Sequence, residues 1–178
     1  MLKIKPEIIF HLAAQPLIYE SYKKPYITFD VNCRGTLNIL EACKARNLER
    51  FVYASSAYAL SNKGGIYGIS KLAAEKIVEE YFRRFLIPFS IIRYGSLYGE
   101  RADGHNGVYQ VLREAIETGA VHIRSDGEEM REYIHAADAA KLSVDVIEDK
   151  KFINRCLDTD IQMPTIKYQL EELKDIYK

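Results

Sequence analysis

The sequence predicts an α/β fold built on a doubly wound parallel sheet. Short apolar runs alternate with longer segments in which apolar residues recur at helical spacing, which is the pattern of successive βαβ units. The runs at residues 7–12, 50–55 and 88–93 have the length and composition of buried strands. Helical patterns at residues 26–46 and 67–85 separate these strands, so they are expected to run parallel.

The rest of the chain continues this alternation. Turn-forming residues indicate loops at residues 16–25, 61–65 and 96–107. The elements predicted after the third strand are helices near 108–118, 136–148 and 165–177, and strands near 121–124 and 152–157.

The composition is that of a globular protein that binds neither nucleic acid nor a membrane. The 178 residues are 48% apolar and 28% charged, and 25 basic residues balance 25 acidic ones, which gives no sign of a polyanion partner. No apolar run approaches the length of a membrane span or of a signal-peptide core. Cys33, Cys43 and Cys156 stand far apart, which predicts buried thiols in a reducing compartment and no metal site. We therefore expect a cytoplasmic protein.

The strongest chemical signal is the segment Tyr67-Gly68-Ile69-Ser70-Lys71. A tyrosine and a lysine four residues apart project from the same face of a helix. A nearby ammonium favours the phenolate and lowers the phenol pKa, which suits Tyr67 to moving a proton at a hydroxyl group. Taken alone, such a spacing more often belongs to a surface pair, so its context decides.

Two hydroxyl side chains end the strand upstream of this helix. Residues 51–56 end in Ser55 and Ser56, and a serine at that position can hydrogen-bond the same substrate oxygen as Tyr67. The alternative is that the serines cap or turn the chain, and each serine can serve one of the two roles.

The front of the predicted sheet lacks a phosphate-binding turn. In a doubly wound sheet a dinucleotide lies on a glycine-rich turn after the first strand, at a helix N-terminus. No GxGxxG or GxxGxxG precedes residue 7, and only six residues precede the first predicted strand. We therefore expect the pyrophosphate-binding part of such a site to be missing, and independent dinucleotide binding to be weak.

Six motifs follow one another along the chain. They are His11-Leu12-Ala13-Ala14-Gln15, the asparagine-containing segment 30–38, the serine strand, the tyrosine–lysine helix, an arginine strand running into Tyr98-Gly99-Glu100-Arg101, and the late element 127–135. In this order they resemble the extended short-chain dehydrogenases/reductases of the NAD-dependent epimerase/dehydratase family, in particular nucleotide-sugar epimerases. The resemblance spans roughly residues 6–148.

The resemblance implies a fold, a cofactor and a catalytic set. Residues 1–100 are expected to form an incomplete, Rossmann-like NAD-binding domain. Residues 101–178 are expected to form mostly a small substrate-binding lobe, with some segments returning to the main sheet. Tyr67 would be the acid/base, Lys71 would tune its pKa and contact the nicotinamide ribose, and Ser56 would be the hydroxyl partner.

The resemblance also implies residues for ligand binding. The backbone of Ala13, Ala14 and Gln15 would pass the cofactor, Asn32 would shape the same region, and Tyr94 would lie near the nicotinamide end.

For the substrate, Ser96 stands where many members have an asparagine that touches the sugar nucleotide. Arg131 matches an arginine that clamps the nucleotide phosphates, for which a bidentate guanidinium is well suited. The alternative for Arg131 is a solvated surface charge beside neighbouring glutamates.

The reaction favoured among family members is epimerisation. Family dehydratases carry an acidic pair directly after the active hydroxyl, whereas Ser56 is followed here by Ala57 and Tyr58. An epimerase needs no such acid, because hydride is removed and returned to the other face of a keto-sugar. The substrate class is a UDP- or dTDP-linked sugar, and the helices at 26–46 and 67–85 resemble those that form the homodimer interface of family members. A dehydratase, reductase or decarboxylase, a non-catalytic remnant and a sugar-nucleotide-binding module remain as alternatives.

Overall fold

A computed structural model describes residues 4–122 and 133–159 of the chain. These residues fall into two compact units. The first comprises residues 4–94 and 143–158, and the second comprises residues 95–122, 133–142 and 159. The division of function expected between residues 1–100 and 101–178 stays a prediction.

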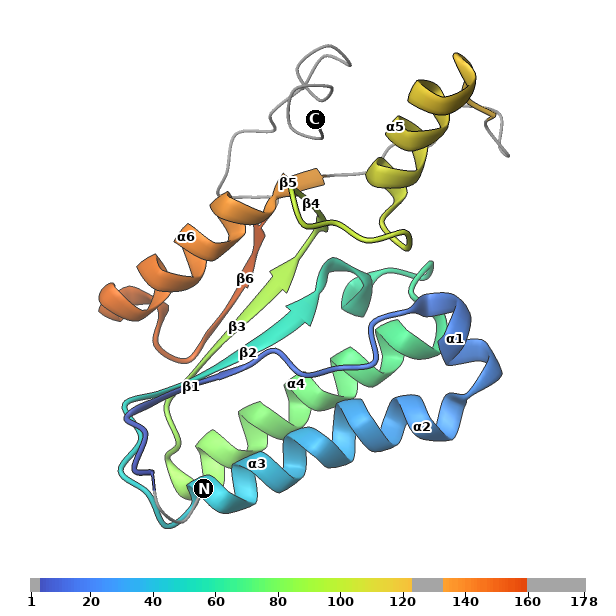
Figure 1. Cartoon of the computed structure of the whole chain (residues 1–178). Helices are drawn as coiled ribbons and strands as arrows, with labels where there is room; N and C mark the ends of the chain where they lie inside the picture. The colour runs from blue at the N-terminus through green and yellow to red at the C-terminus, as the bar shows by residue number, and fades with distance from the viewer. Residues whose placement is uncertain (1–3, 123–132, 160–178) are drawn as a thin grey trace. The chain divides into compact units, whose positions relative to one another are not determined.

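A four-stranded parallel sheet forms the centre of the first unit and confirms the predicted fold class. Its order is β1-β2-β3-β6, and every neighbouring pair is parallel (Figure 1). In register, Phe51 of β2 pairs with Ile9 of β1 on one side and Phe89 of β3 on the other. The strands are β1 (Ile8–His11), β2 (Arg50–Ser56), β3 (Phe89–Tyr94) and β6 (Arg155–Asp158).

Helices cover one face of this sheet. A continuous helical run comprises α2 (Pro25–Phe29), the π-helical turn η1 (Asp30–Arg34) and α3 (Gly35–Cys43), and it lies beside the long helix α4 (Gly65–Phe85) (Figure 1). Because side chains alternate along a strand, every second residue of β2 and β3 points into this layer. The buried cluster they form is Leu40, Cys43, Leu48, Phe51, Tyr53, Ala74, Val78, Tyr81, Ile87, Phe89 and Ile91.

The alternate strand residues face residues 143–148, the second half of α6 (Ala136–Glu148). The buried guanidinium of Arg50 donates from Nη1 to Ser90 Oγ at 2.9 Å and to the Val146 carbonyl oxygen at 3.1 Å. The sheet is thus covered on both faces, as a doubly wound sheet requires.

Several local expectations were wrong. The proline-bounded segment 16–25, expected as a loop, contains helix α1 (Ile18–Lys23). The last strand begins three residues later than expected, because the 3₁₀ turn η3 (Lys150–Phe152) and a turn at residues 153–154 precede it. No strand begins at residues 121–122, and residues 123–124 lie outside the described part of the chain, as does the predicted helix 165–177. Among the cysteines only Cys43 is buried, Cys33 is half-buried and Cys156 is exposed.

The second unit contains a short parallel pair of strands, β4 (Ser96–Tyr98) and β5 (Tyr133–His135). Helix α5 (Gly107–Thr118) and the first half of α6 also belong to it. Residues 96–98 were expected as part of a loop, and their pairing with residues 133–135 is non-local. No helix among the residues described here is both long and apolar enough to cross a membrane.

Candidate active site

The candidate site lies at the carboxyl ends of the parallel strands. β1 ends at His11, β2 at Ser56 and β3 at Tyr94, so the segments after these three strands meet at one edge of the sheet. Ligands of open α/β sheets bind at this edge.

Two glycines bring the start of α4 to the end of β2. A Cβ atom placed on Gly64 or Gly68 would clash with the carbonyl oxygen of Tyr58, which lies in the 3₁₀ turn η2 (Ala57–Leu60). Only a residue without a side chain lets the two backbones approach so closely. This role of the glycines was not predicted from the sequence, although their four-residue spacing was visible.

The close approach places Tyr67 beside Ser56. Tyr67 is 8% exposed, and its backbone N–H donates to Ser21 Oγ at 3.2 Å, which ties this turn of α4 to α1. Burial raises the pKa of the Tyr67 phenol, and a hydrogen bond with the Ser56 hydroxyl partly offsets that rise. The direction is opposite to the lowered pKa expected from the sequence, because burial is the largest influence on the phenol and the Lys71 ammonium is not among the groups that shift its pKa.

Ser56 also keeps the second role foreseen for these serines. Its Oγ accepts a hydrogen bond from the backbone N–H of Tyr58 at 3.2 Å and so caps η2. The same hydroxyl therefore fixes the turn beside Gly68 and touches the phenol of Tyr67.

Lys71 is a buried ammonium directed at the end of β2. It is 2% exposed, its Nζ donates to the Ala54 carbonyl oxygen at 2.5 Å, and it lies 4.5 Å from the ring centroid of Tyr53. Burial lowers the pKa of Lys71 to about 8, while the charge of Glu75 acts in the opposite direction. With this pKa the ammonium is mostly protonated near pH 7, and its charge lies within reach of a ligand that binds at the end of β2.

Asn32 joins the loop after β1 to α4. Its Oδ1 accepts from the Gln15 backbone N–H at 2.7 Å, and its Nδ2 donates to the Gln15 carbonyl oxygen at 3.2 Å and to Ser70 Oγ at 2.8 Å. Asn32 lies in the π-helical turn within a run predicted as one regular helix, and π turns often occur at functional sites. The asparagine thus fixes the backbone of Gln15, at the end of the segment 13–15, relative to the turn of α4 that carries Tyr67.

The other predicted site residues lie in several places. Ala13 is exposed and Ala14 half-buried in the loop after β1, and the Tyr94 hydroxyl is 2.6 Å from Ser143 Oγ. Ser96 begins β4 in the second unit, and Arg131 lies outside the described residues.

A buried charged network below the site was missed by sequence reasoning. Glu75 of α4 is fully buried, accepts a hydrogen bond from the hydroxyl of Ser55 and forms a bidentate ion pair with Arg93 of β3. The signal that could have found it is the spacing of Tyr67, Lys71 and Glu75 at four-residue intervals, which places all three on one helix face.

The described residues fit one end of a dinucleotide better than the other. The buried Lys71, the Tyr67–Ser56 pair and the fixed loop 13–15 form a polar edge suited to a nicotinamide riboside. The glycines of the first unit, Gly35, Gly64, Gly65 and Gly68, lie in or at the starts of helices α3 and α4, and none follows β1. Among the residues described, a glycine turn for the pyrophosphate is therefore absent. Nor do the described residues contain a cluster of histidine, cysteine or carboxylate groups suited to a metal ion.

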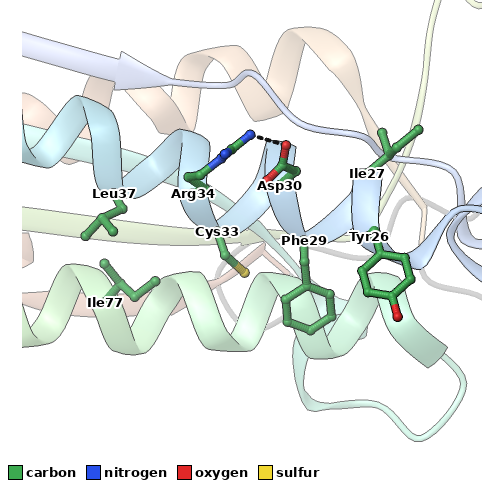
Figure 2. A pocket seen from close by; sticks show the side chains of 8 residues that line it. All are labelled: Tyr26, Ile27, Phe29, Asp30, Cys33, Arg34, Leu37 and Ile77. Atoms are coloured by element: carbon green, nitrogen blue, oxygen red, sulfur yellow. Dashed lines mark hydrogen bonds and ion pairs between the residues drawn. The ribbon is translucent and has the colours of Figure 1, made fainter.

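A groove on the outer surface of α2, α3 and α4 is a second feature of the first unit. It encloses about 550 Å³, and Figure 2 shows its apolar side chains with the Arg34–Asp30 ion pair at its rim. Tyr26 is 90% exposed and Ile27 is 52% exposed. The groove is lined by Tyr26, Ile27, Phe29, Asp30, Cys33, Arg34, Leu37 and Ile77.

Comparison with known proteins agrees with this arrangement. The sequence model of the NAD dependent epimerase/dehydratase family matches residues 1–155. A UDP-glucose 4-epimerase of Mycolicibacterium smegmatis is 31% identical over 153 residues, which cover 76% of this chain and 49% of that protein. The chain thus spans about half the length of the curated relatives it matches.

Two solved structures share the fold. The UDP-glucuronic acid 4-epimerase of Bacillus cereus, in complex with UDP-glucuronic acid and NAD, has a TM-score of 0.80 at 26% identity and covers 88% of this chain and 55% of its own. The UDP-glucose 4-epimerase of Thermotoga maritima, with UDP-glucose, has a TM-score of 0.81 at 25% identity and covers 99% of this chain and 65% of its own.

Proposed function

The chain belongs to the NAD dependent epimerase/dehydratase family, and from that premise we propose that its site serves the epimerisation of a nucleotide sugar with NAD as cofactor. The observation that carries the proposal is the Tyr67 phenol, buried beside the Ser56 hydroxyl one helical turn from the Lys71 ammonium. Relatives named as epimerases of UDP-glucose and UDP-glucuronic acid support a UDP-sugar as the substrate.

Each residue of the set has a separate task in this proposal. Tyr67 exchanges a proton at its phenol oxygen with the sugar hydroxyl that becomes the ketone oxygen. Ser56 hydrogen-bonds the same oxygen and holds the sugar at that end. Lys71 supplies positive charge beneath the site and would hold the cofactor through hydrogen bonds to its ribose hydroxyls. When bound, the cofactor supplies the hydride chemistry of the reaction.

The resting site holds Tyr67 as a neutral phenol, because burial raises its pKa. The hydrogen bond with the Ser56 hydroxyl opposes that rise.

Epimerisation is favoured over dehydration by the two residues after Ser56. Ala57 and Tyr58 form the start of η2, and the Tyr58 backbone packs against α4. Family dehydratases carry carboxylates at these two positions for the elimination of water, and neither Ala57 nor Tyr58 supplies a carboxylate. Dehydratase activity is therefore the second candidate, since the family contains both reactions.

The cofactor contacts of this chain are proposed for the nicotinamide end alone. The backbone of Ala13, Ala14 and Gln15, held at Gln15 by Asn32, borders the cofactor. Lys71 reaches the end of β2 from α4, and Tyr94 ends the neighbouring strand β3. For the substrate we propose Ser96 and Arg131, the latter as a clamp on the diphosphate.

A product assay with matched tyrosine variants tests the proposed function. The chain, with added NAD, is incubated with UDP-glucose or UDP-glucuronic acid, and the 4-epimers are measured by NMR. Conversion that Tyr67→Phe abolishes and Tyr81→Phe preserves supports the proposal, because Tyr81 lies almost four turns further along α4, where its hydroxyl bonds Glu41 and not a site residue. Absence of both conversion and NAD binding contradicts it for this chain. Sugar-nucleotide binding that Tyr67→Phe leaves unchanged supports the non-catalytic binding module instead.

We further propose that the groove on α2, α3 and α4 pairs with the same groove of a second copy. Its exposed aromatic and aliphatic side chains form a continuous apolar surface, whereas the lining charges Asp30 and Arg34 already pair with each other at its rim. A twofold interface joins the same patch on both subunits, so an apolar, internally neutral surface is suited to contact itself.

A further inference from the structure

Glu75 is a fully buried carboxylate held from two strands at once. Its Oε1 accepts from the hydroxyl of Ser55 on β2 and from Arg93 Nε on β3 at 2.9 Å, and its Oε2 accepts from Arg93 Nη2 at 2.6 Å. Because β2 and β3 are neighbours in register, with Ser55 opposite Arg93, the carboxylate bridges both strands at one level of the sheet.

The arrangement is more than is needed to attach a helix to a sheet. Removing two charges from water carries a large desolvation cost, and an apolar residue of similar size often stabilises such a position equally well. On the same face of α4, Lys71 lies one turn before Glu75, while the adjacent Ala74 and Val78, almost one turn after it, pack in the apolar core. The carboxylate thus stands at the border between the core and the candidate site.

Lys71 has no carboxylate bonded to its ammonium among the described contacts. Its Nζ donates to the neutral carbonyl oxygen of Ala54, one residue before Ser55 in β2. Glu75 follows Lys71 by four residues, and Cβ atoms at that spacing are ~6 Å apart. Burial disfavours the Lys71 ammonium, and the negative charge of Glu75 favours it.

The other titratable groups facing Lys71 come from three further elements. The charge of an ionised Cys33 in η1 raises the pKa of Lys71. Burial and the Lys71 charge both lower the pKa of His11 in β1. Tyr53 of β2 places its ring beneath the ammonium. On the other side of Glu75, Arg93 also pairs with Asp158 of β6 at 3.5 Å.

We propose that Glu75 is a positioning residue of the candidate site, which anchors the Lys71 face of α4 to β2 and β3 and keeps a negative charge one helical turn from the ammonium. The role of Lys71 in cofactor binding rests on the proposed function, whereas the effect of the Glu75 charge on the Lys71 ammonium does not depend on it. Ser55 and Arg93 hold the carboxylate, and Lys71 is the group through which it acts.

The test measures the protonation of Lys71 directly, without cofactor or substrate. Protein carrying ¹³C-labelled lysine is titrated by NMR, and the Lys71 Cε signal is assigned by its absence from a Lys71→Arg sample. We expect the wild-type signal to titrate with a pKa of about 8. In Glu75→Gln the Lys71 pKa falls further, by about one unit or more.

The matched control is Glu79→Gln, which removes the same charge from the same helix. Glu79 pairs with the exposed Lys76, so the Lys71 pKa should stay within ~0.2 units of wild type. A folded Glu75→Gln protein whose Lys71 pKa equals that of wild type overturns the proposal and leaves Glu75 as a structural link between helix and sheet.

A second variant covers the case in which Glu75→Gln leaves Arg93 unpaired and does not fold. Glu75→Gln combined with Arg93→Gln removes both charges, and the pair of amides can still hydrogen-bond. In this double variant the Lys71 pKa must again lie below the wild-type value of about 8. A Lys71 pKa equal to that of wild type overturns the proposal. Failure of the epimerase assay contradicts the proposed function alone, because the titration needs no turnover.

Discussion

Gly68 of α4 lies against the carbonyl oxygen of Tyr58 so closely that a methyl group at position 68 would clash with that oxygen. The contact fixes how far the first turn of α4 can approach η2. Since Ser56 caps η2 and Tyr67 precedes Gly68, the distance between the two hydroxyl groups of the candidate site depends on this backbone contact.

Gly68→Ala should therefore destabilise the fold and displace Tyr67. Overpacking of a close contact costs about 1–3 kcal/mol, and here the obstructing atom is backbone, which cannot rotate away. Gly35→Ala is the matched control. Gly35 lies in α3 of the same unit, and the nearest atom to a Cβ placed there is the Asp30 carbonyl oxygen at 3.8 Å, an ordinary contact. That variant should gain about 0.5–1 kcal/mol from alanine's helix propensity. Urea unfolding of both variants checks the opposite signs, and equal effects would contradict the role of the Gly68 contact.

Replacing Lys71 with methionine should change how stability depends on pH. The pKa of Lys71 is lowered to about 8 in the fold, against 10.5 for an ordinary lysine. Between these values the unfolded chain binds more protons, so the stability of the wild type rises with pH, by at most ~1.4 kcal/mol per pH unit for this group. Below pH 8 both states are protonated and the cost of burying the charge is fully present.

The difference in unfolding free energy between Lys71→Met and wild type should thus shift in favour of wild type from pH ~8 upwards. Urea unfolding at several pH values measures it. Lys76→Met is the control, since the Lys76 side chain is 61% exposed and its removal should give a difference that hardly varies with pH. If the difference in unfolding free energy between Lys71→Met and wild type does not change with pH, the pKa of Lys71 is not lowered by folding.

Asn32→Asp tests the link between the loop after β1 and α4. The substitution keeps the acceptor for the Gln15 N–H but removes the donor to the Gln15 carbonyl oxygen and to Ser70 Oγ, and it adds a buried charge. We expect a loss of about 2–4 kcal/mol and faster hydrogen exchange of the amides of residues 13–17. Asn62→Asp, at an exposed loop position, makes the same chemical change and should leave both measurements unaltered. Unchanged exchange in Asn32→Asp would mean that the loop is held by other contacts.

Local features of the fold were easier to predict than long-range ones. The shared face of Tyr67 and Lys71 follows from helix geometry, and the apolar runs identify β1, β2 and β3, so both were predictable. Helix α1 was missed because six residues between prolines are too short for periodicity to show.

Long-range pairings were missed for a different reason. The bonds from Asn32 to Gln15 and Ser70 span 17 and 38 residues, and the Glu75–Arg93 pair depends on the register of β2 and β3. The raised pKa of Tyr67 likewise follows from burial by several elements, whereas the sequence shows only the neighbouring lysine.

The proposed dimer predicts a specific effect of charge on the helical groove. Leu37, 36% exposed, lines the groove beside Ile77. Leu37→Glu would place two like charges near each other across a twofold interface, in an apolar setting where neither is paired. We expect the dimer dissociation constant, measured by sedimentation equilibrium, to rise about 100-fold or more. Val144→Glu puts the same charge on an aliphatic residue that is 52% exposed on α6, outside the groove, and should leave the constant unchanged. A monomeric wild type, or equal weakening by both variants, would contradict the groove as the interface.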